Sequence, residues 1–222
     1  MVNNTAIILG ATGSVGQALL AEVVACSSFS RIVVMTRRPL DMKSGAAVEE
    51  HLVPAMDPAS LEQAVVDALQ GHAGDATGFS VLGVGAGTAK MSIEQHRAID
   101  VGLNAAFARG LRASGKVSHL AFMSAVGADA TARTTGSGAA GMPRYARVKG
   151  EAEAAVLSQG PEVVSIFRPA MIIGSQHTPR LLADRLLYRS SGTLHLLDAA
   201  DAAELGSMPA AAEYGLALDG GY

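Results

Sequence analysis

The sequence has no tryptophan, one cysteine and an aromatic content of only 4%. A single cysteine cannot form a disulfide bond within the chain, which excludes the class of small secreted domains stapled by disulfides. Cys26 falls on the apolar side of an expected helix, and this position predicts a buried structural thiol rather than a reactive one. The scattered aromatic side chains indicate core packing and not a platform on which nucleic-acid bases stack.

An excess of charge of either sign is also absent. The chain of 222 residues has 17 Lys and Arg against 20 Asp and Glu, a net charge of -3, which gives no broad basic surface for nucleic-acid phosphates or anionic lipid. No Lys or Arg precedes Arg31, and no run reaches the ~18 apolar residues of a membrane span, so neither a secretory signal nor a transmembrane helix is expected. We therefore expect a cytoplasmic protein that binds neither nucleic acid nor membrane.

Short apolar, β-branched runs alternate with longer segments of helical periodicity along most of the chain. This alternation is typical of βαβ units that form a parallel sheet with right-handed crossovers. We therefore predict an α/β protein with a doubly wound, mostly parallel sheet (the Rossmann fold) and helices on both faces. One domain is expected over residues 1–222, with a small substrate-side region around 175–222. The expected strands are Thr5–Leu9, Arg31–Thr36, Val48–Val53, Phe79–Val84, Val117–Met123 and Glu162–Phe167.

A glycine-rich turn follows the first expected strand and leads into a segment with the apolar periodicity of a helix. In such a turn Gly10 permits a tight reversal, Gly13 lets the backbone approach a pyrophosphate, and Gly16 allows the helix to pack closely on the strand. The spacing is G-x-x-G-x-x-G rather than G-x-G-x-x-G, and the alternative is that the glycines serve only a tight strand-to-helix turn. The dinucleotide contacts predicted in this turn are Gly10, Thr12, Gly13, Ser14, Val15 and Gly16.

Arg37 and Arg38 stand about 20 residues beyond the turn, where an NAD site places an acidic residue on the ribose hydroxyls. A guanidinium can form two parallel hydrogen bonds with a 2′-phosphate and can stack its plane on adenine, whereas a carboxylate would repel that phosphate. The pair therefore predicts NADP(H) as the cofactor. Two solvated arginines in a loop are the alternative.

Two further positions are candidate cofactor contacts. Asp57 closes the third strand region and could accept a hydrogen bond from the adenine amino group, but an Asp ahead of Pro58 is equally an ordinary helix cap. Gly85 belongs to the run Gly83–Gly87 that ends the fourth expected strand, where small residues let a ribose lie against the backbone.

Tyr145 and Lys149 are four residues apart on an expected helix, Arg144–Leu157, so that both project from one face. Ser124 ends the fifth expected strand, at the carboxyl edge where open α/β sheets bind ligands. A free tyrosine has a pKa of about 10, and a nearby ammonium together with the nicotinamide charge should lower that pKa. These residues predict carbonyl chemistry, with Tyr145 as acid/base and Ser124 donating a hydrogen bond to the developing oxyanion.

The segment from Gly127 to Gly141 lies between Ser124 and Tyr145 and is rich in Ala, Gly, Thr and Ser. This composition predicts a mobile loop, and the position of the segment predicts a lid that orders when substrate enters. Such a lid would show high mobility in the absence of substrate.

The order of these motifs resembles that of the short-chain dehydrogenase/reductase superfamily, over roughly residues 5 to 175. The motifs are the glycine turn, Asp57, Ser124, the Tyr145-x-x-x-Lys149 pair and the stretch Arg168–Gly174. Within the superfamily, the phrases FMSAVGAD at 122–129 and YARVKGE at 145–151 are most similar to the atypical branch related to the Tat-interacting protein oxidoreductases.

This resemblance implies an NADP-binding Rossmann domain in which Tyr145 is the acid/base, Lys149 binds the nicotinamide ribose and Ser124 contacts the substrate. It further implies that Pro169 and Ile172 touch the nicotinamide. Residues beyond Gly174 are hard to match to the superfamily.

Two classes of function follow. The first is an NADP(H)-dependent oxidoreductase that transfers hydride to or from a small carbonyl or alcohol. The second is a non-catalytic NADP(H)-binding sensor or scaffold that keeps the fold for binding a partner. The presence of Ser124, Tyr145 and Lys149 together favours the enzyme. A monomer or weak homodimer is expected, and no metal site, because the six histidines lack the spacing of metal ligands.

Overall fold

The computed structural model describes residues 4–40, 48–71, 74–170 and 172. The chain divides into two compact units, Met1–Arg168 and Pro169–Tyr222, and every described helix and strand belongs to the first. The single-domain organisation expected from the sequence stays a prediction. The substrate-side region expected around 175–222 lies outside the described residues.

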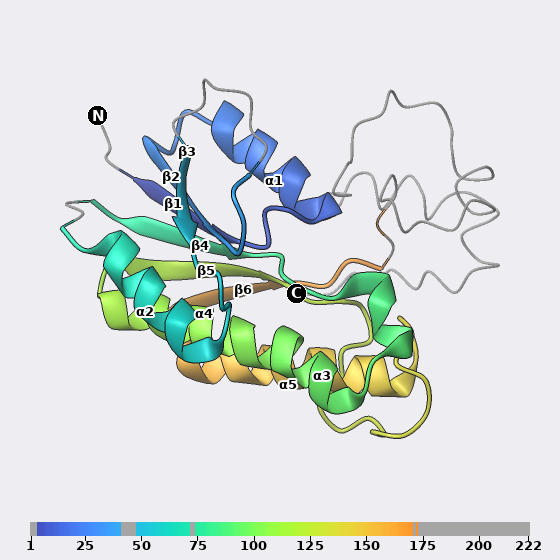
Figure 1. Ribbon diagram of the computed structural model, residues 1–222. Coiled ribbons are helices and arrows are strands. Elements are labelled where there is room, and N and C mark those ends of the chain that lie inside the picture. The colour runs from blue at the N-terminus through green and yellow to red at the C-terminus, as the bar shows by residue number, and fades with distance from the viewer. Residues whose placement is uncertain (1–3, 41–47, 72–73, 171, 173–222) are drawn as a thin grey trace, which may run out of the picture. The chain divides into compact units, whose positions relative to one another are not determined.

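Six strands form one sheet in the order β3-β2-β1-β4-β5-β6 (Figure 1). Each neighbouring pair is parallel. Strand order reverses between β1 and β4, the switch point outside which doubly wound sheets bind ligands. The predicted doubly wound α/β sheet is therefore confirmed. The strands are β1 (Thr5–Leu9), β2 (Arg31–Thr36), β3 (Val48–Leu52), β4 (Ala76–Ser80), β5 (Val117–Met123) and β6 (Val163–Phe167).

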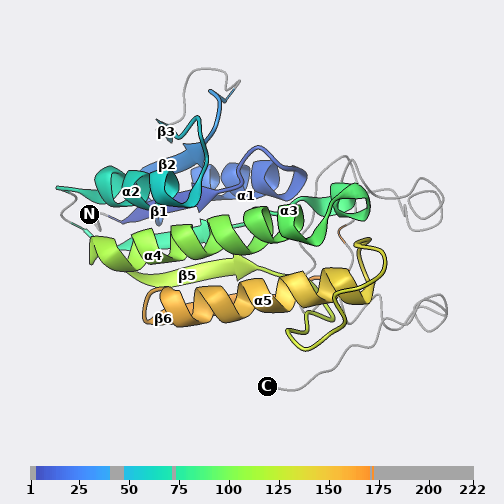
Figure 2. The same cartoon turned by 60° about the horizontal axis from the view of Figure 1, so that its bottom comes forward.

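Helices cover both faces of this sheet, as predicted (Figures 1 and 2). One face carries α1 (Ser14–Ala25), and the other carries α2 (Pro58–Leu69), α4 (Asn104–Ser114) and α5 (Pro143–Gln159). In Figure 2, α4 and α5 run side by side across β5 and β6. Because neighbouring strands are all parallel, their carboxyl ends lie along one edge of the sheet.

The central strand shows how the sequence produces two cores. Successive side chains of a strand point to opposite faces. Accordingly, Ala6 and Ile8 pack in the cluster that contains Leu20 of α1. Ile7 and Leu9 pack in the larger cluster under the other three helices. All five residues of β1 are buried, which is why the strand appears in the sequence as an unbroken apolar run.

β4 begins three residues earlier and ends four residues earlier in the sequence than expected. The predicted strand was Phe79–Val84, whereas β4 is Ala76–Ser80 and pairs with β1 as far as Leu9. β1 ends there because the chain turns at Gly10, so a parallel partner cannot continue beyond this point. The Val81 N–H still donates to the Leu9 carbonyl oxygen at 3.0 Å. The prediction followed the apolar run, but the partner strand sets where β4 ends.

The prediction for Cys26 was wrong. This residue is exposed and caps the carboxyl end of α1. The buried side of α1 is formed by Val15, Leu20 and Val23, and the helix has ended before Cys26 can join them. Hydrogen bonds from Ser28 lower the pKa of the Cys26 thiol.

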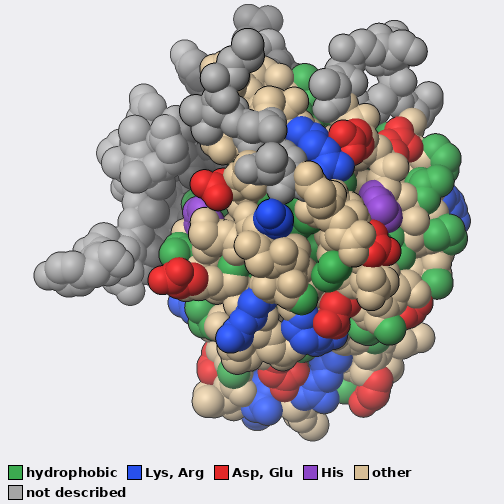
Figure 3. Space-filling model, turned by 90° about the vertical axis from the view of Figure 1, so that its left-hand side faces the viewer, with side chains coloured by type: hydrophobic (Ala, Val, Ile, Leu, Met, Phe, Trp, Pro, Cys, Tyr) green, Lys and Arg blue, Asp and Glu red, His purple; other side chains and the backbone are tan. Residues whose placement is uncertain are grey.

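The surface of the described residues agrees with the balanced composition. Acidic and basic side chains are interspersed on the face that Figure 3 shows. Among the described helices, none is both long and apolar enough to cross a bilayer.

Candidate active site

The glycine turn joins β1 to α1 with backbone packed on backbone. Gly10 has a φ of +94°, which favours glycine, and a Cβ added there would lie 2.7 Å from the Leu82 nitrogen. A Cβ on Gly16 would lie 2.0 Å from the Gly10 carbonyl oxygen. Both glycines are therefore required by close packing, and the steric roles predicted for them are confirmed.

Gly13 has a different role from its neighbours in the turn. It is the N-cap residue of α1, with no side chain to cap the helix, and the first turn of α1 carries no acidic residue. A Cβ there would meet only the Gly10 carbonyl oxygen, at an ordinary 3.5 Å, so internal packing does not require glycine. The first N–H groups of a helix lack partners within the helix and attract anions. This open helix start fits a pyrophosphate, and the contacts predicted for Thr12, Ser14 and Val15 stay predictions.

Arg37 and Arg38 follow β2 and are exposed. The Thr36 hydroxyl donates to the Arg38 carbonyl oxygen at 2.8 Å and so shapes the start of this segment. Because β2 pairs in parallel with β1, the segment leaves the sheet at the same edge as the glycine turn. The position suits recognition of a 2′-phosphate, and the contact itself stays a prediction.

Asp57 is the N-cap residue of α2. Its Oδ1 accepts the Ser60 N–H at 3.0 Å and its Oδ2 accepts the Ser60 hydroxyl at 2.6 Å. These hydrogen bonds hold the pKa of the Asp57 carboxyl below its usual value. Of the two roles considered, the helix cap is the one observed, while contact with adenine stays a prediction. Gly85, the other candidate after β4, starts the short helix η1 (Gly85–Lys90) with a φ of +63°.

α5 carries Tyr145 and Lys149 on successive turns, close to the predicted helix bounds. The helix begins at Pro143, where the missing N–H costs nothing and the fixed φ suits a first turn. Tyr145 is half-buried, whereas Lys149 is only 3% exposed. A lysine is almost never buried to this extent unless it is paired.

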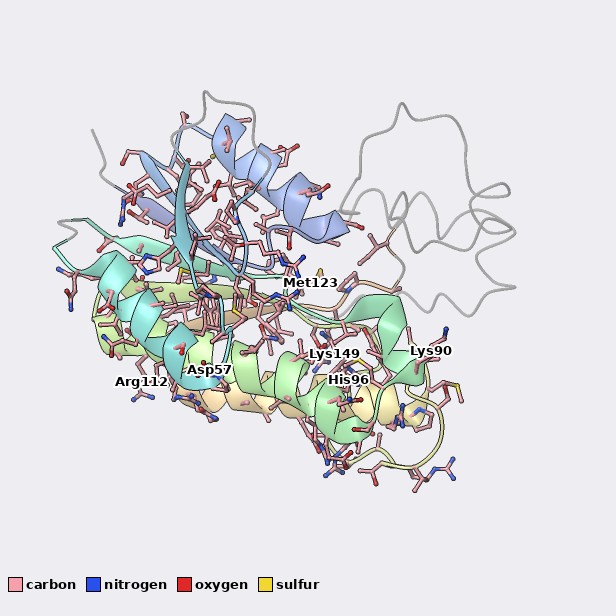
Figure 4. All side chains as sticks on the ribbon, viewed as in Figure 1. Asp57, Lys90, His96, Arg112, Met123 and Lys149 are labelled. Atoms are coloured by element: carbon pink, nitrogen blue, oxygen red, sulfur yellow. The ribbon has the colours of Figure 1, made fainter. Side chains whose placement is uncertain are left out.

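The partner of Lys149 is Asp100, a residue that the sequence analysis did not single out. The Lys149 Nζ lies 3.4 Å from Asp100 Oδ1, and His96 Nε2 lies 3.6 Å from the same oxygen. Asp100 Oδ2 accepts the Val84 N–H at 3.1 Å. All three side chains are buried, and Figure 4 shows Lys149 and His96 together beside α3 (Ile93–Arg97) and α5. The charge of Lys149 is thus offset inside the protein.

Asp100 reaches Lys149 from an unusual turn of helix. It belongs to η2 (Ala98–Leu103), a π-helical segment between α3 and α4, and π turns inside helices are frequent at functional sites. The Asn104 side chain donates to the Asp100 carbonyl oxygen at 2.8 Å and also to the Leu82 carbonyl oxygen at 3.3 Å. These bonds hold η2 against the chain that leaves β4.

The structure shifts the pKa of the Tyr145 phenol in the direction opposite to the one predicted from the sequence. Burial raises the pKa of Tyr145 to about 12, and the negative charge of Asp100 adds to this effect. The lowering expected from the Lys149 ammonium together with the nicotinamide charge is not seen in the protein without cofactor, where burial and the charge of Asp100 disfavour the phenolate. Burial also acts to raise the pKa of Asp100, but its contacts with His96, Lys149 and the Val84 N–H outweigh burial and hold that pKa below its usual value.

The ring of His96 lies against Tyr145. The two ring centroids are 5.7 Å apart and the planes differ by 29°, a stacked arrangement. His96 is 1% exposed. It therefore contacts both the tyrosine ring and the carboxylate that pairs with Lys149.

Ser124 follows β5 directly, as predicted, and is 3% exposed. Its N–H donates to the Phe167 carbonyl oxygen at 2.7 Å, but its hydroxyl has no hydrogen-bond partner among the described residues. A buried polar atom without a partner is rare and calls for an explanation such as a bound ligand. Phe122 lies two residues earlier, with its ring centroid 5.7 Å from the Lys149 Nζ. Ser124 and Lys149 therefore lie at the same end of the sheet.

Hydrogen bonds and close packing hold the segment from Gly127 to Gly141 against α5. The Asp129 N–H donates to the Ala146 carbonyl oxygen at 3.0 Å, and Arg147 donates to the Ala132 carbonyl oxygen at 3.3 Å. A Cβ on Gly150 would lie 2.1 Å from the Ala130 nitrogen. These contacts favour a fixed wall beside the site over the mobile lid that composition predicted.

Pro169 and Ile172 belong to the second unit of the chain, and their contacts with a nicotinamide stay predictions. His96 and Asp100 are the site residues that sequence reasoning missed. Their one detectable signal was an i, i+4 spacing of two ionisable groups on a helical segment.

Comparison with known proteins supports the fold independently. No family model matches the chain. A short-chain dehydrogenase/reductase from Serratia marcescens is similar with a TM-score of 0.60 and 16% identity, over 83% of this chain and 81% of that one. The structure of MoeE5 in complex with UDP-glucuronic acid and NAD is similar with a TM-score of 0.58 and 19% identity, over 81% of this chain. The chain spans 59% of the length of MoeE5.

Similarity to a curated protein indicates which branch of the superfamily the chain resembles. Protein HTATIP2 of Rattus norvegicus is 29% identical over 182 residues, which are 81% of this chain and 67% of that protein. The chain therefore resembles the atypical short-chain dehydrogenase/reductases of the HTATIP2 branch. The family resemblance inferred from the motifs is thereby confirmed.

Proposed function

We propose that this protein is an atypical short-chain dehydrogenase/reductase, an NADP(H)-dependent oxidoreductase that acts on a small carbonyl or alcohol. The observation that carries the proposal is the set of groups at the carboxyl end of β5. Tyr145 and Lys149 lie on one face of α5, and the buried Ser124 hydroxyl lies at the same end of the sheet without a partner among the described residues.

The proposal for the cofactor depends on the residues that follow β1 and β2, on the other side of the switch point. An uncapped helix start after a glycine turn suits the pyrophosphate of a dinucleotide, and the neighbour MoeE5 was solved with NAD. Arg37 and Arg38 stand where NAD sites carry an acid. A guanidinium pair favours a 2′-phosphate through bidentate, charge-assisted hydrogen bonds, so we propose NADP(H) rather than NAD.

Tyr145, Ser124 and Lys149 would each have a separate role in the proposed reaction. A bound NADPH would supply the hydride. The Tyr145 hydroxyl would donate its proton to the substrate oxygen, and the Ser124 hydroxyl would donate a hydrogen bond to the same oxygen as negative charge develops there. The Lys149 ammonium would hold the ribose hydroxyls beside Tyr145.

The test is turnover by the Tyr145→Phe variant. NADPH absorbance with a panel of aldehydes, ketones and quinones would first locate an activity in the wild type. Tyr145→Phe keeps the ring and its stacking on His96 but removes the proton donor, so turnover should fall by about 10²–10⁴-fold. Its affinity for NADPH, measured by calorimetry, should stay within about twofold.

A wild type that binds NADPH but turns over none of these compounds would contradict the oxidoreductase. Activity that survives in Tyr145→Phe would contradict the role of Tyr145. In the first case the non-catalytic sensor or scaffold would keep the cofactor site and become the better account.

A further inference from the structure

The ring of His96 packs against the ring of Tyr145, the proposed proton donor. The two ring centroids are 5.7 Å apart and the planes differ by 29°, within the range of distances that aromatic pairs prefer. His96 comes from α3, whereas Tyr145 lies in the first turn of α5, which begins at Pro143. The proposed function gives no role to His96, although this residue contacts the acid/base directly.

Histidine is a costly residue for this position if packing is its only role. The side chain is 1% exposed, and neither ring nitrogen has a hydrogen-bond partner among the described residues. Its Nε2 lies 3.6 Å from Asp100 Oδ1, beyond hydrogen-bond distance. Burying unpartnered nitrogens costs free energy that a leucine would not. An imidazole, unlike leucine, presents a flat face to a phenol and a polar edge to a carboxylate, so the ring itself is what the position uses.

Contacts on both sides of His96 hold α3 against α5. Arg97, the next residue, donates two hydrogen bonds of 2.7 Å to the Glu151 carboxylate on α5. Before α3, the Met91 carbonyl oxygen accepts a hydrogen bond of 2.8 Å from Arg144 of α5. A capping box fixes the start of α3. A helix of five residues is not stable by itself, so these contacts determine where the His96 ring lies.

Tyr145 lies where such support matters. It is half-buried and belongs to the end of a helix, where a side chain has more than one staggered rotamer open to it. A phenol displaced by about 1 Å from its productive position can lose about 10²-fold in rate. We propose that His96 is a positioning residue whose ring fixes the Tyr145 ring in the orientation that proton donation requires. His96 acts through this stacking and need not touch substrate or cofactor. The inference rests on the proposed function.

Nuclear magnetic resonance can detect the stacking without cofactor or substrate. The chain has 4 tyrosines, so isotope labelling of the tyrosine rings gives few signals, and the signal that Tyr145→Phe lacks belongs to Tyr145. The ring current of a stacked aromatic neighbour displaces this signal from that of a free tyrosine. His96→Phe keeps a ring and should keep the signal displaced. His96→Gln keeps a polar side chain near Asp100 but removes the ring, so the signal should move toward the free value.

The same two variants should differ in NADPH-dependent turnover. His96→Gln should lower kcat by about 10–100-fold, because the phenol is misplaced, and should leave the KM for NADPH within about twofold, because the cofactor contacts remain. His96→Phe should stay within about threefold of the wild type in both constants. His51→Gln makes the matched substitution at a half-buried position of β3 and should change neither. Circular dichroism restricts the comparison to folded variants.

A folded His96→Gln variant with an unmoved Tyr145 signal or with wild-type turnover would overturn the proposal. A His96→Phe variant that loses as much turnover as His96→Gln would overturn it too. Should His96→Gln fail to fold, His96→Leu, which is apolar and suits a buried position, decides by the same two measurements. If the wild type turns over no compound, the Tyr145 signal still shows whether His96 orders this ring, so failure of the oxidoreductase and failure of this inference can be told apart.

Discussion

The two sides of the candidate site are built by opposite means. After β1, between Gly10 and Gly16, no charged side chain occurs, and the chain presents backbone that is packed on backbone. Beyond the switch point, between α3 and α5, the site consists of buried ionisable side chains that balance one another. On the first side Gly10 and Gly16 have no room for a Cβ, whereas on the second side each buried charge needs its partner.

The largest expected effect tests the charge balance. Lys149→Met would leave Asp100 buried without one of its two side-chain partners, and the free energy of unfolding should fall by about 3–5 kcal/mol. Lys116→Met makes the same substitution at an exposed position and should change stability by less than about 0.5 kcal/mol. Urea unfolding of both variants provides the measurement. Equal losses would show that the second side of the site does not depend on its charges.

The next effect separates two glycines of the turn. Gly16→Ala places a Cβ on the Gly10 carbonyl oxygen and should destabilise the fold by about 1–3 kcal/mol. Gly13→Ala meets only an ordinary contact, so it should cost less than about 1 kcal/mol while weakening NADPH binding. Thermal unfolding and calorimetric titration distinguish the two. A Gly13→Ala variant that binds NADPH as tightly as the wild type would show that phosphate does not approach this backbone.

A smaller effect concerns the choice between NADPH and NADH. Here the first side of the site would bind the cofactor through charged side chains, those of Arg37 and Arg38. The wild type should bind NADPH about tenfold or more tightly than NADH, which corresponds to about 1.4 kcal/mol. Replacing both Arg37 and Arg38 with Ala should remove this preference without a change in unfolding. Arg112→Ala on α4, also exposed, is the control that should keep it. Equal affinities of the wild type for both cofactors would contradict the assignment of NADP(H).

The smallest effect belongs to the cap of α2. Asp57→Ala removes both bonds to Ser60 and should cost about 1 kcal/mol of stability, whereas Asp57→Ser can still cap the helix and should cost less. Calorimetric titration with NADPH tests the second role considered for Asp57, a contact with the adenine of the cofactor. If Asp57→Ser keeps the stability but loses affinity for NADPH, the carboxylate also contacts the cofactor.

The same contrast explains how much could be predicted from the sequence. The turn was predictable because only glycine fits a positive φ at Gly10 and the contact at Gly16, and such requirements are local. Tyr145 and Lys149 were predictable because four residues on a helix define one face. The role of Asp100 was not, because it depends on how η2 packs against α5, a contact between residues 49 positions apart. The direction of the Tyr145 pKa was missed for a related reason, because both the burial of this side chain and its proximity to Asp100 depend on tertiary packing.

The π turn of η2 has a consequence for how this region can vary. An α-helix turns by 3.6 residues, so adding or removing one residue rotates everything on one side of the change by roughly 100°. Ala98–Leu103 contains such an irregularity between α3 and α4. The two helices therefore have independent phases: α4 can keep its apolar side on the sheet while α3 and Asp100 face α5. Deleting a single residue between Asp100 and Asn104 would keep the apolar side of α4 on the sheet but turn Asp100 away from Lys149, which would leave the buried Lys149 ammonium without this partner.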